Sequence, residues 1–275
     1  MCQNYFIRRP HRLTLVIMIK IIMSINSFLI STTPRTGSMW LYNVTREILK
    51  FSKINVLPTK IPKSSLEFFE IFEKQSLIDQ NNSNKYVFKI HRILNPNLPR
   101  SKILTTIRDP RDVCISFKEF MKTDFNTALK AAKDLLQYEK IYKNYNKDYV
   151  KFFRYEDIEN QSIETVLEIA NFIGYEISYK NAKEISLKFN KKKIKNLIKN
   201  NDENLIYKIQ NKEDIDDSSI VYFSKDNYRS FDTKTGFQTN HISNRNSGDW
   251  KKSFSSKEIE ILNFEFKDFI SEYKF

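Results

Sequence analysis

The feature that most constrains the fold is an alternation of short apolar runs with longer segments of helical spacing. The runs are rich in β-branched or aromatic residues and nearly continuous, as in strands covered on both faces: SFLIST, KYVFKIH, SKILTTI and YVKFFRY. The helical segments follow or separate them: SMWLYNVTREILKF, RDVCISFKEFMK, TALKAAKDLLQYEKIYKNY and SIETVLEIANFIGY. Strand alternating with helix predicts a parallel α/β sheet with right-handed crossovers.

The chain is long enough for one large domain or two small ones, at 275 residues. We predict one α/β domain over residues 26–275, with a P-loop-like parallel sheet of about five strands flanked by helices. Residues 189–240 are polar and rich in Lys and Asn. They are interpreted as a mobile cap over a site, with a solvated surface insertion as the alternative. Residues 255–275 read as a helix opened by a capping box from Ser255 to Glu258.

Residues 1–25 form an N-terminal extension whose first part resembles a signal peptide or membrane anchor. RRPHR precedes the apolar run LTLVIMIKIIM, which Lys20 interrupts, and no small-residue cleavage site follows. A membrane span of about 20 residues would also consume the first strand. Two cysteines, Cys2 and Cys114, make no disulfide framework. We therefore expect a cytoplasmic protein outside the membrane, with a signal-anchor as the less favoured alternative.

The net charge is +13, from 46 Lys+Arg against 33 Asp+Glu, and it predicts attraction to anions. The alternative is an AT-rich coding sequence, because Lys, Asn and Ile are all abundant. No RNA-recognition or helix-turn-helix signature is present, so we expect no nucleic-acid partner. The histidines, His11, His91 and His241, are too scattered to suggest a metal site, and none is predicted.

The stretch STTPRTGSMW, residues 31–40, joins a strand directly to a helix. Amides of residues 36–39 then point out of the helix N-terminus, where free donors and the dipole favour an anion. Gly37 allows close backbone approach, and Thr36 and Ser38 add hydroxyls. The loop that binds nucleotide triphosphates with Mg²⁺ has a lysine after its second glycine, and that lysine is missing here. The basic residue of this loop is instead Arg35, which lies two residues before Gly37. An ordinary strand-to-helix turn is the alternative.

Lys89 and His91 end another strand and lie on one face of it, because strand side chains alternate. At the carboxyl end of a parallel strand they stand over the crevice where α/β proteins bind ligands. A histidine there can take a proton from an acceptor hydroxyl near neutral pH. The alternative is a structural histidine.

Two arginines occupy positions suited to phosphate. Arg108 follows a strand beside a helix start, with Ser116 two turns along that helix, and its planar fork fits a phosphate. Alternatively, Arg108 pairs with Asp112. In SNRNSGDWKKSF, residues 243–254, Arg245 precedes a glycine turn whose amides also suit a phosphate, or which is simply a surface turn.

Five segments together resemble the PAPS-dependent sulfotransferases, particularly the cytosolic type and its bacterial relatives. In chain order they match the family's PKSGTTW-like loop, its K-x-H, its R-[ND]-P-[KR]-D-x-x-x-S, its Y-E-D and its R-x-G-x-x-G-D-W-K: Pro34–Trp40, Lys89–His91, Arg108–Ser116, Tyr155–Asp157 and Arg245–Lys251. The third match is complete, and the resemblance covers about residues 26–263.

The resemblance implies a site for 3′-phosphoadenylyl sulfate (PAPS). By it, the loop holds the 5′-phosphosulfate end, Trp40 and Tyr155 line the adenine, and Arg108, Ser116 and Arg245 hold the 3′-phosphate. Phe189 is a further candidate for stacking on the base. The implied cofactor-binding residues are Arg35, Thr36, Gly37, Ser38, Met39, Trp40, Arg108, Ser116, Tyr155, Arg245, Asn246 and Ser247. Met39 stands where a hydroxyl is usual, and Asn246-Ser247 where a basic residue and glycine are usual.

The implied activity is transfer of a sulfuryl group to the hydroxyl or amine of a small-molecule or glycan acceptor. His91 takes the acceptor's proton, while Arg35 and Lys89 neutralise charge. Arg35 replaces the family's lysine and cannot act as an acid, so its role is electrostatic. A homodimer is compatible with this reading.

Two alternatives belong to other classes. A P-loop kinase needs a Mg²⁺-holding loop that the sequence does not show. A basic protein that only binds nucleotide or nucleic acid does not need His91, and the intact His91 favours an enzyme.

Overall fold

The computed structural model describes residues 25–76, 84–95, 97, 98, 100–224 and 227–275. The predicted N-terminal extension therefore lies almost entirely outside the described residues. Within these ranges, no helix is both long and apolar enough to cross a membrane.

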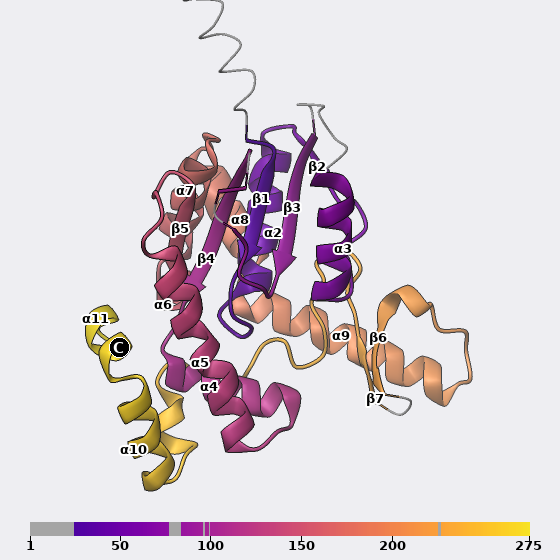
Figure 1. The fold of residues 1–275 in the computed structure, drawn as a ribbon. Coiled ribbons are helices and arrows are strands. Elements are labelled where there is room, and N and C mark those ends of the chain that lie inside the picture. Colours follow the sequence, from indigo (N-terminus) through magenta and orange to yellow (C-terminus); the bar gives the residue numbers. More distant parts are fainter. Residues whose placement is uncertain (1–24, 77–83, 96, 99, 225–226) are drawn as a thin grey trace, which may run out of the picture.

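A parallel sheet of five strands forms the centre of the part that is described (Figure 1). Its order is β2-β3-β1-β4-β5, and every neighbouring pair is parallel. The strands are β1 (Ser27–Ser31), β2 (Asn55–Leu57), β3 (Asn84–Ile90), β4 (Ser101–Ile107) and β5 (Val150–Arg154). Each of the four apolar runs is a strand, so the predicted α/β sheet is confirmed. Every residue of β1 is buried, because helices cover both faces of the sheet.

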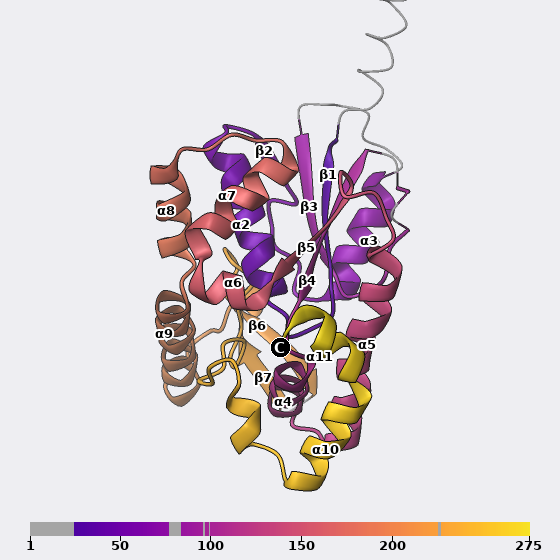
Figure 2. The ribbon, with the colours of Figure 1, turned by 90° about the vertical axis from the view of Figure 1, so that its left-hand side faces the viewer.

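Helices cover the sheet on two sides (Figure 2). One side carries α2 (Ser38–Phe51), α7 (Ser162–Ile173) and α8 (Tyr179–Lys188), and the other carries α3 (Ser65–Ser76) and α5 (Phe125–Tyr142). The main hydrophobic cluster lies between these helices and the strands.

A second hydrophobic cluster lies beyond the carboxyl ends of the strands. It joins α5 to α4 (Pro110–Met121), η2 (Asp249–Lys252), α10 (Ser256–Glu265) and α11 (Lys267–Tyr273). The predicted capping box at the start of α10 is confirmed. The single helix predicted for the C-terminal segment is instead two, which meet at the buried Phe266.

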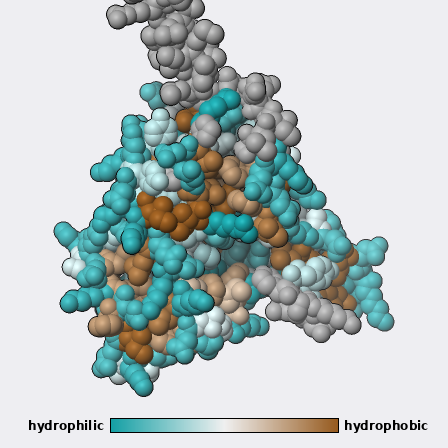
Figure 3. Space-filling view, in the orientation of Figure 1, coloured by the Kyte–Doolittle hydropathy of each residue, from teal (hydrophilic) through white to brown (hydrophobic). Residues whose placement is uncertain are grey.

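Residues 189–240 contain more regular structure than their composition suggests. They form α9 (Lys191–Gln210), η1 (Asp217–Ser219) and an antiparallel hairpin of β6 (Ile220–Ser224) and β7 (Asn227–Ser230). Figures 1 and 3 show α9 and the hairpin projecting from the main body. The helix α9 is amphipathic and buries three apolar side chains: Ile194, Ile198 and Leu205. The role of this segment as a mobile cap stays a prediction.

Candidate functional site

The predicted motifs meet at one edge of the sheet, because they follow four neighbouring parallel strands. Arg35 follows β1, His91 follows β3, Arg108 follows β4 and Tyr155 follows β5, where it begins α6 (Tyr155–Asn160). After β1 the chain builds β2 and β3 on one side of it and then crosses to β4 and β5 on the other side, so the strand order reverses next to β1. Ligands of α/β proteins bind at such a switch point.

The loop between β1 and α2 has a backbone shape that requires its glycine. Gly37 has φ 96° and Arg35 has φ 71°, both in the left-handed region. A Cβ on Gly37 would lie 3.1 Å from the Tyr155 ring and 3.4 Å from Ile158. Glycine thus lets α6 pack directly against the loop, which fixes the start of α2.

The hydroxyl of Thr36 points into the protein. Its Oγ1 donates to the carbonyl oxygen of Thr33 at 2.7 Å and lies 2.9 Å from Thr32 Oγ1. Thr106 Oγ1, on β4, donates to it at 2.6 Å. This threonine cluster (Thr32, Thr36 and Thr106) joins two positions of the loop to each other and to β4, so Thr36 supports the loop from the interior.

Arg35 extends from the loop towards α4. Its Nε donates to Ser116 Oγ at 3.0 Å, its Nη2 donates to the carbonyl oxygen of His241 at 3.1 Å, and its guanidinium lies 4.2 Å from the centre of the Phe120 ring. Burial, together with the nearby Arg108, lowers the pKa of Arg35 to about 9. The side chain is therefore charged at neutral pH in surroundings that favour an anion.

His91 is held as a neutral imidazole. Its Nδ1 lies 2.8 Å from the carbonyl oxygen of Thr32, which can only accept, so Nδ1 carries the proton and Nε2 is an acceptor. Lys89 Nζ lies 3.3 Å from that Nε2. Burial and the Lys89 charge lower the pKa of His91 to about 3, and burial lowers the pKa of Lys89 to about 8. At neutral pH the acceptor nitrogen Nε2 of His91 therefore faces the ammonium group of Lys89.

Arg108 supports the loop and keeps one donor unused. Its Nη1 donates to the carbonyl oxygen of Arg35 at 2.9 Å, and its guanidinium lies 3.9 Å from the centre of the Tyr155 ring. Its buried Nε has no hydrogen-bond partner among the described residues. Asp112, the alternative partner of Arg108, accepts instead from the backbone nitrogen of Gly248 at 2.8 Å. That bond holds the Gly248 turn against α4.

The Gly248 turn is bonded to α4 and α6. Arg245 donates from Nε to Glu119 Oε2 at 2.8 Å, and its other nitrogens donate to Glu119 Oε1 and to Ser253 Oγ. The backbone nitrogen of Asn246 donates to Asp249 Oδ2 at 2.8 Å, which closes the turn. Ser247 Oγ donates to Glu159 on α6, also at 2.8 Å.

A cavity of about 710 Å³ joins three predicted residues of the site. Arg35, Ser116 and Arg245 line it, together with Glu119 and Phe120 of α4. The basic side chains of Lys118 and Lys122 also line it.

The remaining predicted residues lie around α2 and α8. Ser38 begins α2, and Met39 and Trp40 are buried in the main hydrophobic cluster. A Cβ on Gly236 would lie 2.7 Å from Met39 Cε, so the Met39 side chain packs against that turn. Phe189 is also buried in the main cluster.

Sequence reasoning did not identify His241 and Glu119 as site residues. His241 stacks on Phe120 with ring centres 5.4 Å apart, and its Nδ1 accepts from the backbone nitrogen of Gln238 at 3.1 Å. Burial, together with Arg35 and Lys89, lowers the pKa of His241 well below its usual value. Neither residue belongs to a motif, so the sequence carries no signal for them.

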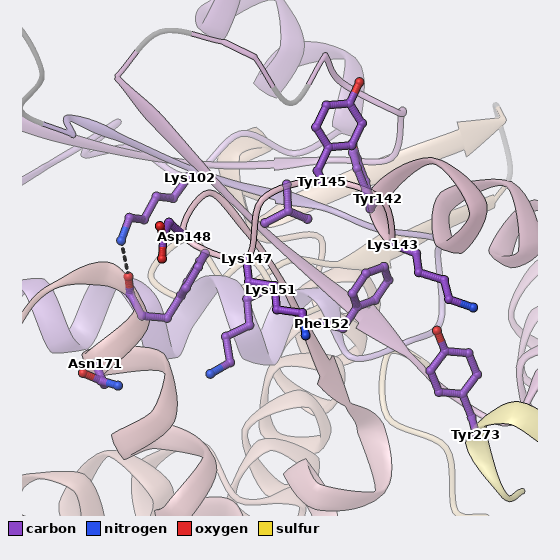
Figure 4. Close-up of a pocket in the computed structure, with 12 residues that line it drawn as sticks. Lys102, Tyr142, Lys143, Tyr145, Lys147, Asp148, Lys151, Phe152, Asn171 and Tyr273 are labelled. Carbon is purple, nitrogen blue, oxygen red and sulfur yellow. Dashed lines mark hydrogen bonds between the residues drawn. The ribbon is translucent and has the colours of Figure 1, made fainter.

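Another cavity, of about 510 Å³, lies at the opposite edge of the sheet, near the starts of β4 and β5 (Figure 4). Several lysines line it, but protein groups engage them. Lys102 donates to the carbonyl oxygen of Phe172 at 2.6 Å, and Lys151 pairs with Glu168 at 2.8 Å. None of the predicted site residues is among those that line this cavity. In the described part of the chain, no group of His, Cys, Asp and Glu side chains could hold a metal ion.

Comparison with known proteins agrees with this arrangement. Residues 26–272 match the family model of the sulfotransferase domain. Similar solved structures include mouse sulfotransferase SULT7A1 complexed with PAP, with 16% identity, a TM-score of 0.59 and coverage of 92% of this chain and 88% of that one. They also include retinol dehydratase in complex with androsterone and inactive cofactor PAP, with 13% identity, a TM-score of 0.55 and coverage of 91% and 82%. At these identities the likeness is one of fold. No curated protein matches the sequence.

Proposed function

Because this chain belongs to the sulfotransferase domain family, we propose that it transfers a sulfuryl group from PAPS to the hydroxyl or amine of an acceptor. The observation that carries the proposal is the state of His91. A neutral imidazole with Nε2 as acceptor stands beside two cations, Lys89 and Arg35, at the carboxyl edge of the sheet. A base next to positive charge suits proton removal from an acceptor during transfer of an anionic group.

The cationic residues fit a nucleotide with two phosphate positions. Buried cations are stable only when paired, and Arg108 has a buried Nε without a partner in the described ranges. We assign Arg108, Ser116 and Arg245 to the 3′-phosphate, with Asn246 and Ser247 in the adjoining turn. We assign the loop of Arg35, Thr36, Gly37, Ser38 and Met39 to the 5′-phosphosulfate end, where α2 begins. Trp40 and Tyr155 are assigned to the adenine.

The bound nucleotide supplies the activated sulfuryl group. His91 Nε2 accepts the proton of the acceptor, while the Thr32 carbonyl holds Nδ1 and so fixes the tautomer. Lys89 and Arg35 place positive charge where negative charge develops. No step requires a proton from Arg35, which stays charged at neutral pH.

A small molecule with a hydroxyl is the first acceptor class to test. Two of the similar solved structures are of retinol dehydratase, one in complex with androsterone and one with retinol. Aromatic side chains, Phe120 and Phe237, pack around His241 near this edge of the sheet. Glycans and amines form the second group, in keeping with the wider acceptor class expected from the sequence.

Two measurements test the proposal. Adenosine 3′,5′-bisphosphate should raise the melting temperature, since a ligand that prefers the folded state stabilises it, and ATP with Mg²⁺ should do so much less. Purified protein with ³⁵S-labelled PAPS should then label at least one acceptor in a panel of alcohols, phenols, glycans and amines. A larger shift with ATP would favour a kinase, and a shift without transfer to any acceptor would favour a nucleotide-binding protein. The homodimer stays a prediction that light scattering can test. The cytoplasmic location stays a prediction that cell fractionation can test.

A further inference from the structure

Glu119 stands among the cations that line the larger cavity. Its two carboxylate oxygens accept from Nε and Nη2 of Arg245, in a fork-to-fork pair. The hydrogen bond from Arg245 lowers the pKa of Glu119, and Arg35 contributes to the same shift. The carboxylate therefore interacts with both arginines of the cavity, and Arg245 Nη1 is engaged by Ser253.

Because Arg245 Nη1 donates to Ser253, a phosphate that binds Arg245 through two nitrogens competes for the edge formed by Nε and Nη2, which Glu119 occupies. Carboxylate and phosphate both accept two parallel N–H bonds from arginine, so Nε and Nη2 cannot serve both at once. Arg35, which donates to Ser116 in this cavity, has only backbone and hydroxyl oxygens as hydrogen-bond acceptors: Ser116 Oγ and the His241 carbonyl. Among the described contacts of Arg35 and Arg245, Glu119 thus holds the place of an anion.

We propose that Glu119 is a built-in competitor of the 3′-phosphate: it occupies Arg245 in the free protein, and the 3′-phosphate of a nucleotide must displace it before Arg245 can bind that phosphate. The proposal rests on the proposed function. A nucleotide with a 5′-phosphate alone has no group that competes for Arg245, so Glu119 stays in place. The 3′-phosphate of a 3′,5′-bisphosphate displaces Glu119 and pairs with Arg245.

The pair is weak enough to be exchanged. The side chains of Arg245 and Glu119 are 27% and 44% exposed, and exposed ion pairs contribute little free energy because water competes with them. Removing the carboxylate should therefore tighten binding of the bisphosphate by about three- to fivefold.

Isothermal titration calorimetry on the full chain tests this with adenosine 3′,5′-bisphosphate and adenosine 5′-monophosphate. Glu119→Gln should tighten binding of the bisphosphate and leave the monophosphate unchanged. In an Arg245→Gln background the same change should have no effect, since the guanidinium for which the two anions compete is gone. Glu272→Gln is the matched control, because Glu272 is similarly exposed, at 43%, and pairs with Lys143 on another surface.

Each result decides the question. Unchanged or weaker bisphosphate binding by Glu119→Gln would overturn the proposal. It would mean that Glu119 holds Arg245 in position and does not compete with the phosphate. An equal gain for both nucleotides, or the same gain in Glu272→Gln, would also overturn it, because it would be an effect of net charge. If neither the wild-type chain nor Glu119→Gln binds bisphosphate, the proposed function fails as well. Binding by the wild type with no gain in the variant overturns this inference alone.

Discussion

Arg108 and Arg35 behave as one unit at the scale of residues. Arg108 donates to the backbone of Arg35, and its charge helps to lower the pKa of Arg35. Arg108 also lies on the Tyr155 ring, which packs against Gly37. Loss of the Arg108 side chain should therefore affect both nucleotide binding and the shape of the β1–α2 loop.

Replacing Arg108 with alanine should weaken binding of adenosine 3′,5′-bisphosphate by about 1.5–3 kcal/mol, the usual range for a hydrogen bond to a charged group. Calorimetry measures the affinity, and circular dichroism checks that the variant is folded. Arg108→Lys keeps the charge without the fork and should recover only part of the loss. Unchanged affinity in folded Arg108→Ala would mean that this guanidinium serves the loop only.

His91→Ala should lower turnover by about 10²–10⁴-fold while leaving bisphosphate affinity close to that of the wild type. The reason is that Nε2 is assigned to the acceptor's proton and to no part of the nucleotide. His91→Gln, which keeps a polar side chain of similar size but is not a base, should be equally slow. Near-normal turnover in either variant would refute the role of His91 as a base.

The pH dependence should come from Lys89. With a pKa of about 3, His91 is already neutral above pH 4, so we expect no histidine step in kcat/KM between pH 5 and 8. Lys89 has a pKa of about 8 and is charged below it, so kcat/KM should fall as pH rises through about 8. Lys89→Arg, charged at all these pH values, should move this fall to higher pH. A rise in kcat/KM near pH 6.5 would contradict the neutral state of His91.

At the scale of elements, the β1–α2 loop gets its shape from the threonine cluster behind it. The cluster joins two threonines of the loop to each other and to Thr106 of β4 through side-chain bonds that all lie in the interior. Because buried polar groups are costly to leave unpaired, the loop and its attachment to β4 should lose stability together.

Thr36→Val should lower the free energy of unfolding by about 1–3 kcal/mol, because it leaves the Thr33 carbonyl without its hydrogen-bond donor and takes from the Thr106 hydroxyl one of its two hydroxyl partners, the other being Thr32. Thr36→Ser keeps the hydroxyl and is the control. Urea unfolding measures both. If the Thr36→Val variant were as stable as the Thr36→Ser variant, the hydroxyl of Thr36 would contribute nothing to the stability of the protein.

Elements with strong periodicity could be predicted from the sequence. The helical segment from Ser38 to Phe51 has the bounds that were expected, and the four apolar runs became strands. The strand β2 was not located, since it has three residues and one of them, Asn55, is exposed. The C-terminal helix was predicted as one, because its pattern does not show that Phe266 is buried at a bend.

The site could be predicted only as far as its motifs reach. Residues that follow neighbouring parallel strands meet at one edge of the sheet, so the sequence alone predicts that Arg35, His91 and Arg108 lie close together. The contact between Glu119 and Arg245 joins positions 126 residues apart and depends on where α4 ends. Local patterns carry no information about such a pair.

At the scale of the whole molecule, the site is assembled from nearly the full length of the chain. Its residues come from after β1, β3, β4 and β5 and from the Gly248 turn. That turn is itself anchored by Trp250 in the second hydrophobic cluster, so the C-terminal helices support a site formed mainly by the first half of the sequence.

This dispersal has a consequence for the kinetics of folding. Contacts between residues far apart in the chain form late, after costly loops have closed, and the contacts that hold Arg35 to Ser116 and Arg245 to Glu119 are of this kind. The nucleotide therefore binds the native state and not the transition state for folding. Saturating bisphosphate should slow the unfolding rate in proportion to the stabilisation it gives and leave the refolding rate almost unchanged, which stopped-flow fluorescence in urea can measure.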